Sequence, residues 1–126
     1  MNKNMSIEER LKMAKLQIQE EKSYLSDLPI DTASIFQIVK KFIDQWDPFG
    51  LLAIECPPDE YESEIRRITI YITKHLNDLD VHELEKHIRS TFEDTFEEDV
   101  VQDQRSVDVT NAIFTSLKEG KFIFPC

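Results

Sequence analysis

Apolar side chains recur once per helical turn along most of this chain, and this periodicity most constrains its fold. Spacings of three and four residues place such side chains on one face of an α-helix. Glycine and proline, which interrupt helices, occur only twice and five times in 126 residues. The pattern therefore predicts an all-α fold, a single compact bundle of four to five helices within one domain, residues 1–126.

The first predicted helix covers residues 6–26 and begins with a capping box, in which Ser6 precedes Glu9 by three residues. Its apolar seam is narrow, and Glu21 occupies a seam position where an apolar side chain is expected. We therefore expect a peripheral helix, packed on the domain or paired with its copy in a homodimer. The seam residues are Ile7, Leu11, Ala14, Ile18 and Leu25.

A helical core is expected over residues 31–98, followed by a C-terminal helix and an apolar tail over residues 99–126. Within Ile68–Thr73, β-branched and aromatic residues would also suit a strand, but the alternation stops at both ends of this stretch. We therefore interpret it as helix. Gly120 is expected to be the C′ cap of the last helix. The expected helices cover residues 31–46, 60–76, 80–98 and 107–119, with residues 99–106 as a loop.

The stretch from Gln45 to Ile65 holds the only tryptophan and three of the five prolines. Proline disfavours helical angles in the preceding residue, so a helix should end near Trp46, and Asp-Pro-Phe-Gly matches a type I turn. We interpret the stretch as a structural corner between helices. An aromatic pocket formed by Trp46, Phe49 and Tyr61 is the alternative. The corner residues are Trp46, Asp47, Pro48, Gly50, Pro57, Asp59 and Tyr61.

These residues resemble the YugE-like proteins, short helical proteins of Bacillus-type bacteria and their phages with unknown function. The resemblance rests on WDPFGL at 46–51, on Pro57 and on DEYESEI at 59–65, and it covers roughly residues 32–98. Glu55 and Cys56 stand where the family often has Gly-Ala. The resemblance implies a helical bundle in a bacterial cytoplasm and carries over no catalytic residue.

Negative charge is concentrated in the second half of the chain. The net charge is −10, of which residues 1–58 contribute −2 and residues 59–126 contribute −8. Residues 92–104 hold six acids and no base. Such a field disfavours nucleic acid and anionic membranes and favours a basic protein partner, although solubility alone also explains it. The candidate partner-binding residues are Asp94, Glu97, Glu98, Asp99 and Asp103.

Catalytic and metal-binding patterns are missing from the sequence. His82 and His87 are five residues apart, so a helix does not place them on one face as a zinc protease requires. Cys56 and Cys126 fit no metal spacing and are expected to be reduced thiols of a cytoplasmic protein. No glycine-rich phosphate loop or nucleophile elbow occurs. We therefore expect no enzyme activity, no metal and no cofactor.

Three functional interpretations follow from the sequence, of which the third, an enzyme or metal protein, is disfavoured because no catalytic constellation occurs. The first is a non-catalytic partner-binding or adaptor protein. The second is an acidic inhibitor, of the toxin-immunity or phage anti-defence type, that masks a basic surface of a target enzyme.

Overall fold

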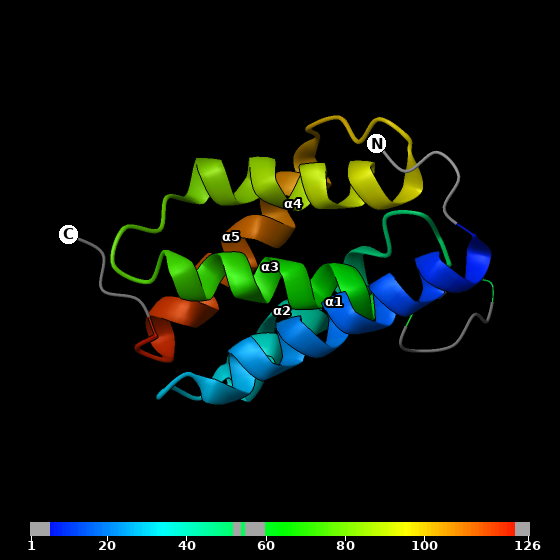
Figure 1. Cartoon of the computed structure of the whole chain (residues 1–126). Helices are drawn as coiled ribbons and strands as arrows, with labels where there is room; N and C mark the ends of the chain where they lie inside the picture. The colour runs from blue at the N-terminus through cyan, green and yellow to red at the C-terminus, as the bar shows by residue number, and fades with distance from the viewer. Residues whose placement is uncertain (1–5, 52–53, 55–59, 123–126) are drawn as a thin grey trace.

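The structure, a computed structural model, describes residues 6–51, 54 and 60–122. These residues form five α-helices and no strand, which confirms the predicted all-α bundle (Figure 1). The Ile68–Thr73 stretch is helical, as expected. The helices are α1 Ile7–Asp27, α2 Thr32–Trp46, α3 Glu62–Lys74, α4 Val81–Phe96 and α5 Gln104–Glu119.

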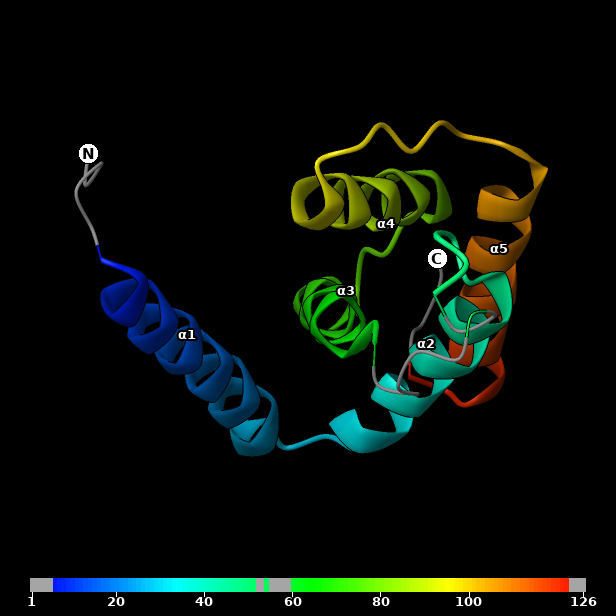
Figure 2. The same ribbon diagram turned by 90° about the vertical axis from the view of Figure 1, so that its right-hand side faces the viewer.

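Helices α2 to α5 surround one apolar core. α2 contacts α3 and α5, and α4 contacts the same two helices, so the four helices close into a ring (Figure 2). The side chains at its centre are fully or almost fully buried, and α2 to α5 all contribute to them. The core residues are Ile35, Val39, Ile43, Tyr61, Ile65, Ile68, Ile72, Leu84, Ile88, Phe92, Val109, Ile113 and Leu117.

Side-chain caps fix where four of the helices begin. Ser6, Asp31, Asp80 and Asp103 each accept hydrogen bonds from backbone N–H groups in the first turn of α1, α2, α4 and α5. These N–H groups have no partner within a helix, so each cap satisfies donors that would otherwise depend on water. The cap expected from Asp59 for α3 is wrong: α3 begins at Glu62, two residues later than predicted, its N-cap position is Tyr61, and no side chain of the described residues caps it.

Helix α1 lies at the edge of the bundle and contacts α3. None of its residues is buried. Glu21, which interrupts the apolar seam, accepts a hydrogen bond from Arg66 Nε at 2.8 Å. The Arg66 side chain is 5% exposed. The hydroxyl of Tyr24 also contacts the hydroxyl of Thr73, at 3.3 Å. The charged residue in the seam therefore contributes to attaching α1 to the bundle.

Two predicted details at the ends of α5 are wrong. α5 begins at Gln104 rather than Val107, because Asp103 and Ser106 form a reciprocal capping box before the apolar pattern starts. At the other end, Gly120 has helical angles and Lys121 takes the left-handed conformation, with φ 61°. Gly120 instead lies close to Phe122: an added Cβ would be 2.7 Å from the Phe122 ring, which would have to move.

Candidate functional site

The five acidic residues predicted to bind a partner lie at the C-terminal end of α4 and on the connection to α5, the yellow-to-gold segment of Figure 1. All five are exposed. We call this surface the acidic edge; it consists of Asp94, Glu97, Glu98, Asp99 and Asp103.

The acidic edge places negative charge where helix α4 disfavours it. The C-terminus of a helix carries a partial negative charge, so nearby carboxylates are repelled. α4 ends as Glu97 turns left-handed, with φ 55°, and its N–H donates to the Glu93 carbonyl at 2.9 Å. Within the described part of the chain, Glu97, Glu98 and Asp99 make no side-chain hydrogen bond or ion pair. Their charges are thus available to a partner.

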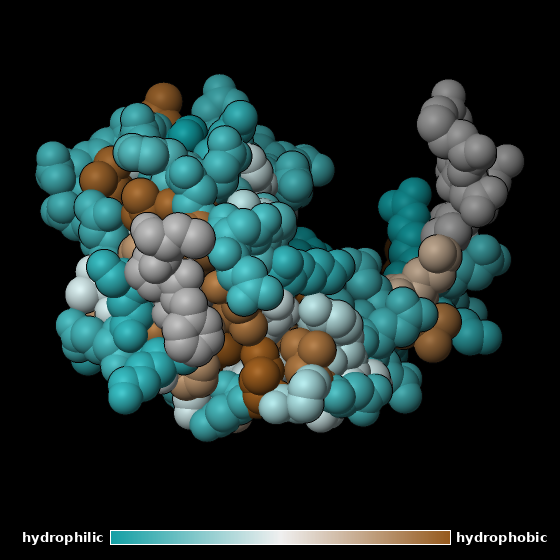
Figure 3. Space-filling model, turned by 90° about the vertical axis from the view of Figure 1, so that its left-hand side faces the viewer, coloured by the Kyte–Doolittle hydropathy of each residue, from teal (hydrophilic) through white to brown (hydrophobic). Residues whose placement is uncertain are grey.

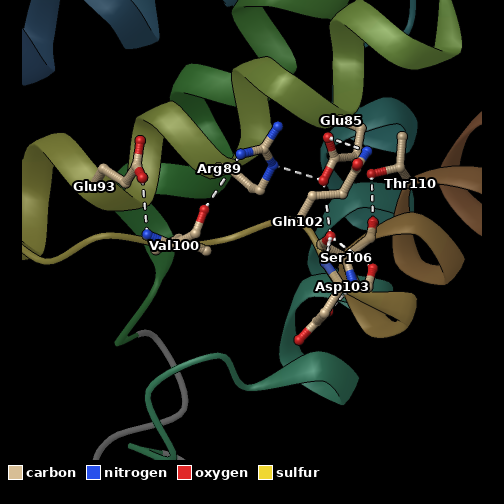
Figure 4. A network of polar contacts seen from close by, with 8 residues as sticks. All are labelled: Glu85, Arg89, Glu93, Val100, Gln102, Asp103, Ser106 and Thr110. Carbon is tan, nitrogen blue, oxygen red and sulfur yellow. Dashed lines mark hydrogen bonds and ion pairs between the residues drawn. The ribbon is translucent and has the colours of Figure 1, made fainter.

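Two side chains of α4 hold the connection that carries these charges. Glu93 Oε2 accepts a hydrogen bond from the Val100 N–H at 2.8 Å, and Arg89 Nη1 donates to the Val100 carbonyl at 3.4 Å (Figure 4). Both backbone groups of Val100 are therefore bound to α4. The acids at 97–99 lie between the end of α4 and this anchor.

A buried carboxylate, that of Glu85, fixes the other end of the connection. Glu85 is 4% exposed and accepts from Arg89 Nε at 2.7 Å, from Ser106 Oγ at 2.8 Å and from Gln102 Nε2 at 3.2 Å (Figure 4). A buried charge is tolerated when it is paired and hydrogen-bonded in this way. The carboxylate joins α4, the connection and the start of α5. The hydrogen bond from Arg89 to Glu85 raises the pKa of the Arg89 guanidinium, which keeps it charged.

Asp103 differs from the other acids of the acidic edge. Its Oδ1 accepts from the Ser106 N–H at 2.8 Å, while Ser106 Oγ accepts from the Asp103 N–H at 3.0 Å. The side chain therefore caps α5 and is also exposed. A structural role accounts for Asp103, whereas it does not account for Glu97, Glu98 or Asp99.

Sequence reasoning missed the residues that anchor the acidic edge. Glu85 and Arg89 lie four apart on a helix, a spacing typical of ion pairs, and Asp103 and Ser106 have the spacing of a capping box. These local signals were present. The contact between these two pairs could not be predicted, because it depends on how α4 packs against α5.

The predicted corner is built around the hydroxyl of Tyr61. Tyr61 is fully buried, donates to Asp47 Oδ1 at 2.5 Å and accepts from the N–H groups of Phe49 and Leu51 at 3.3 and 3.4 Å. Burial, followed by the hydrogen bond to Asp47, raises the pKa of Tyr61 to about 12, so the hydroxyl stays protonated. The turn hydrogen bond from the Gly50 N–H to the Asp47 carbonyl is present at 3.0 Å.

The rings of the corner pack against aromatic rings of α4. Trp46 and Tyr61 each meet Phe92 edge-on, with centroids 5.6 Å apart, and Phe49 stacks on Phe96 at 4.2 Å. The described corner residues, including Pro48 and Gly50, therefore belong to the core and its turn. Two further predicted corner residues, Pro57 and Asp59, lie outside the described residues.

Two of the three histidines share one aromatic partner. His75 and His87 both pack on the Tyr71 ring, at centroid distances of 4.4 and 4.0 Å. Burial, together with the neighbouring His75, lowers the pKa of His87, so its imidazole is neutral at neutral pH. Among the described residues no group of three or more potential ligands could hold a metal ion. Cys56 and Cys126 lie outside those residues.

Comparison with protein-family models, with curated proteins and with solved structures finds no match to this chain. Across residues 6–51 and 60–122, no helix combines the length and the apolar character needed to cross a bilayer.

Proposed function

We propose that this chain is a non-catalytic partner-binding or adaptor protein whose acidic edge contacts a basic surface of another protein. The observation that carries the proposal is the placement of Glu97, Glu98 and Asp99. They are exposed, unpaired within the described residues and located at the negative end of α4. This arrangement is unfavourable for the isolated chain, and a basic partner would remove the repulsion.

The anchoring of the connection supports the same proposal. Glu93 and Arg89 bind both backbone groups of Val100, and Glu85 binds Gln102. A surface whose backbone is already fixed loses less conformational entropy when it binds. The net charge of −10 would also increase the rate of encounter with a basic protein at low salt.

The second candidate function is an acidic inhibitor that masks a basic surface of a target enzyme, as toxin-immunity or phage anti-defence proteins do. The same fixed surface supports it, because a rigid acidic patch can cover a site that binds phosphates or nucleic acid. The resemblance to YugE-like proteins would place either function in a bacterial cytoplasm. Loss of the partner's activity on binding separates the inhibitor from the adaptor.

A charge-reversal experiment tests the role of the acidic edge. The test variant carries Glu97→Lys, Glu98→Lys and Asp99→Lys. The control carries Glu20→Lys, Glu83→Lys and Glu119→Lys, three exposed acids elsewhere with the same change in net charge. Asp103 is changed only to Asn, in a separate variant that preserves the cap. Lysines near the end of α4 favour the helix, so the test variant should be at least as stable in urea.

Binding is measured by retaining proteins of the native host on each immobilised variant, then by calorimetry with the purified partner at several salt concentrations. We expect a basic protein that the wild type and the control retain, that the test variant loses, and whose affinity falls with salt. Equal retention by the test variant and the control would overturn the proposal.

A further inference from the structure

The N-terminal part of α1 projects beyond the bundle with its apolar seam uncovered. Figure 2 shows α1 apart from the four-helix ring, and Figure 3 shows it as an arm that carries apolar side chains away from the body. Ile7 is 75% exposed and Leu11 57% exposed, while Ala14 is also exposed. We call residues 7–18 the arm. The arm shares no residue with the acidic edge.

The bundle covers only the C-terminal half of the α1 seam. Half-buried seam positions begin at Ile18 and continue through Glu21 and Leu25. Ile7, Leu11 and Ala14 continue the same face at spacings of four and three residues. They extend it about 16 Å beyond Ile18, at 1.5 Å per residue. The arm therefore presents an apolar helix face that has no partner within the described chain.

We propose that the arm pairs antiparallel with the arm of a second copy of this chain across a two-fold axis. In this register Ile7 of one copy packs on Ile18 of the other, and Leu11 packs on Ala14, each pair occurring twice. The small Ala14 side chain lets the two helices approach closely at the centre. The pairing reuses one surface on both copies, as a two-fold interface requires.

Charges beside the seam favour this orientation over a parallel one. In the antiparallel register Glu8 flanks Lys15 of the other copy, and Arg10 flanks Gln17, so two opposite-charge pairs form. In a parallel pair the flanking positions place Arg10 beside Lys15 of the other copy, which repel each other twice. The arm sequence thus complements itself in one direction only.

The overlap also ends where the bundle begins. The tip of one arm, at Ile7, reaches Ile18 of the other copy, where contact with that copy's own bundle starts. The paired segment, residues 7–18, spans about 18 Å at 1.5 Å per residue. The whole uncovered part of each seam is used in this register.

Sedimentation equilibrium of the full chain, from micromolar to millimolar concentration, tests the pairing. The wild type should associate to a dimer, and Leu11→Asp should abolish the dimer. Leu16→Asp is the matched control, because Leu16 is 49% exposed but lies about 140° around α1 from Leu11. Neither residue is buried, so both variants should remain folded. A wild type that stays monomeric at millimolar concentration, or equal loss with Leu16→Asp, would overturn the proposal.

A charge exchange tests the orientation. Lys15→Glu turns two attractive Glu8 pairs into repulsive ones in the antiparallel dimer and should raise the dimer Kd about tenfold. The double variant Glu8→Lys, Lys15→Glu should restore the wild-type Kd. In a parallel dimer Lys15→Glu would instead relieve the repulsion with Arg10. Tighter association of Lys15→Glu, or no restoration in the double variant, would contradict the antiparallel arrangement.

Discussion

Helices α1 and α2 begin with the same kind of cap but are buried to very different extents. Each starts with a side-chain cap, from Ser6 or Asp31, and each carries a regular apolar seam. α2 buries Ile35, Val39 and Ile43 completely, whereas α1 buries no residue. The difference lies in the width of the apolar face. Beside its seam, α2 adds four half-buried side chains that pack against the core, those of Phe36, Ile38, Phe42 and Trp46.

The two helices are also attached by different forces. α2 is held by apolar burial along its whole seam, which is the dominant stabilising term in folding. α1 is held through the charge of Glu21, which pairs closely with Arg66 and more distantly with Arg67, together with a hydroxyl contact and a few half-buried side chains. A helix can therefore be attached to the bundle while half of its apolar seam stays uncovered and available to another surface.

The largest expected effect comes from shortening one seam residue in each helix. Ile43→Ala should lower the free energy of unfolding by about 2–5 kcal/mol, because it leaves a cavity in the core. Leu11→Ala should change it by less than about 0.5 kcal/mol, because that side chain is exposed. Urea unfolding of dilute protein measures both. Similar losses in the two variants would mean that the arm packs on its own bundle.

The next effect separates the attachment of α1 from the core. Arg66→Met keeps the apolar stem but removes the 2.8 Å hydrogen bond to Glu21. It should lower the free energy of unfolding by about 1–3 kcal/mol. Hydrogen exchange should accelerate in residues 18–27 more than in α2. The control is Arg67→Met, since Arg67 is 39% exposed and lies 3.8 Å from Glu21. Uniform acceleration across all helices would contradict a local attachment.

Within the bundle, a smaller effect is expected from the anchor of the acidic edge. Ser106→Ala removes the hydrogen bond to the buried Glu85 and one half of the capping box, and should cost about 1–2 kcal/mol. Exchange of the Val100 and Asp103 amides should accelerate as well. Ser116→Ala, at a half-buried position on the same helix, should be nearly neutral. If both variants behave alike, the anchor does not hold the connection.

The smallest effect depends on pH. Burial raises the pKa of Glu64, so the folded protein retains a proton at pH values where the unfolded chain has lost it. The free energy of unfolding therefore falls as pH rises through the window just above the ordinary pKa of a glutamate. Glu64→Gln should remove this fall, so that the variant becomes more stable relative to the wild type as the pH rises from acidic to neutral. Parallel stability curves for the two proteins would show that Glu64 titrates normally.

Much of the bundle could be predicted because its determinants are local. The seam of α2, the Asp-Pro turn and the aspartate caps depend on residues a few positions apart. The start of α5 escaped prediction because Ser106, rather than a glutamate, completes the capping box with Asp103. The left-handed residue after α5 also escaped prediction: it is Lys121 rather than Gly120, which lies close to the Phe122 ring.

The long-range polar pairs could not be predicted in the same way. Glu21 meets Arg66 across 45 residues, and Glu85 meets Ser106 across 21, so each pairing depends on how the helices pack. The acids at 97–99 were readable as a charged run. That their backbone is fixed on both sides required the structure.

Hydrogen exchange of the wild-type chain at low and at high protein concentration tests most directly whether the arm stands free of its own bundle. At micromolar concentration the amides of residues 9–15 should exchange almost as fast as in an isolated helix. Those of residues 36–43 in α2, around the buried Val39, should remain protected. At millimolar concentration the arm alone should become slower. Protection of the arm equal to that of α2 in dilute protein, with no dependence on concentration, would contradict the account.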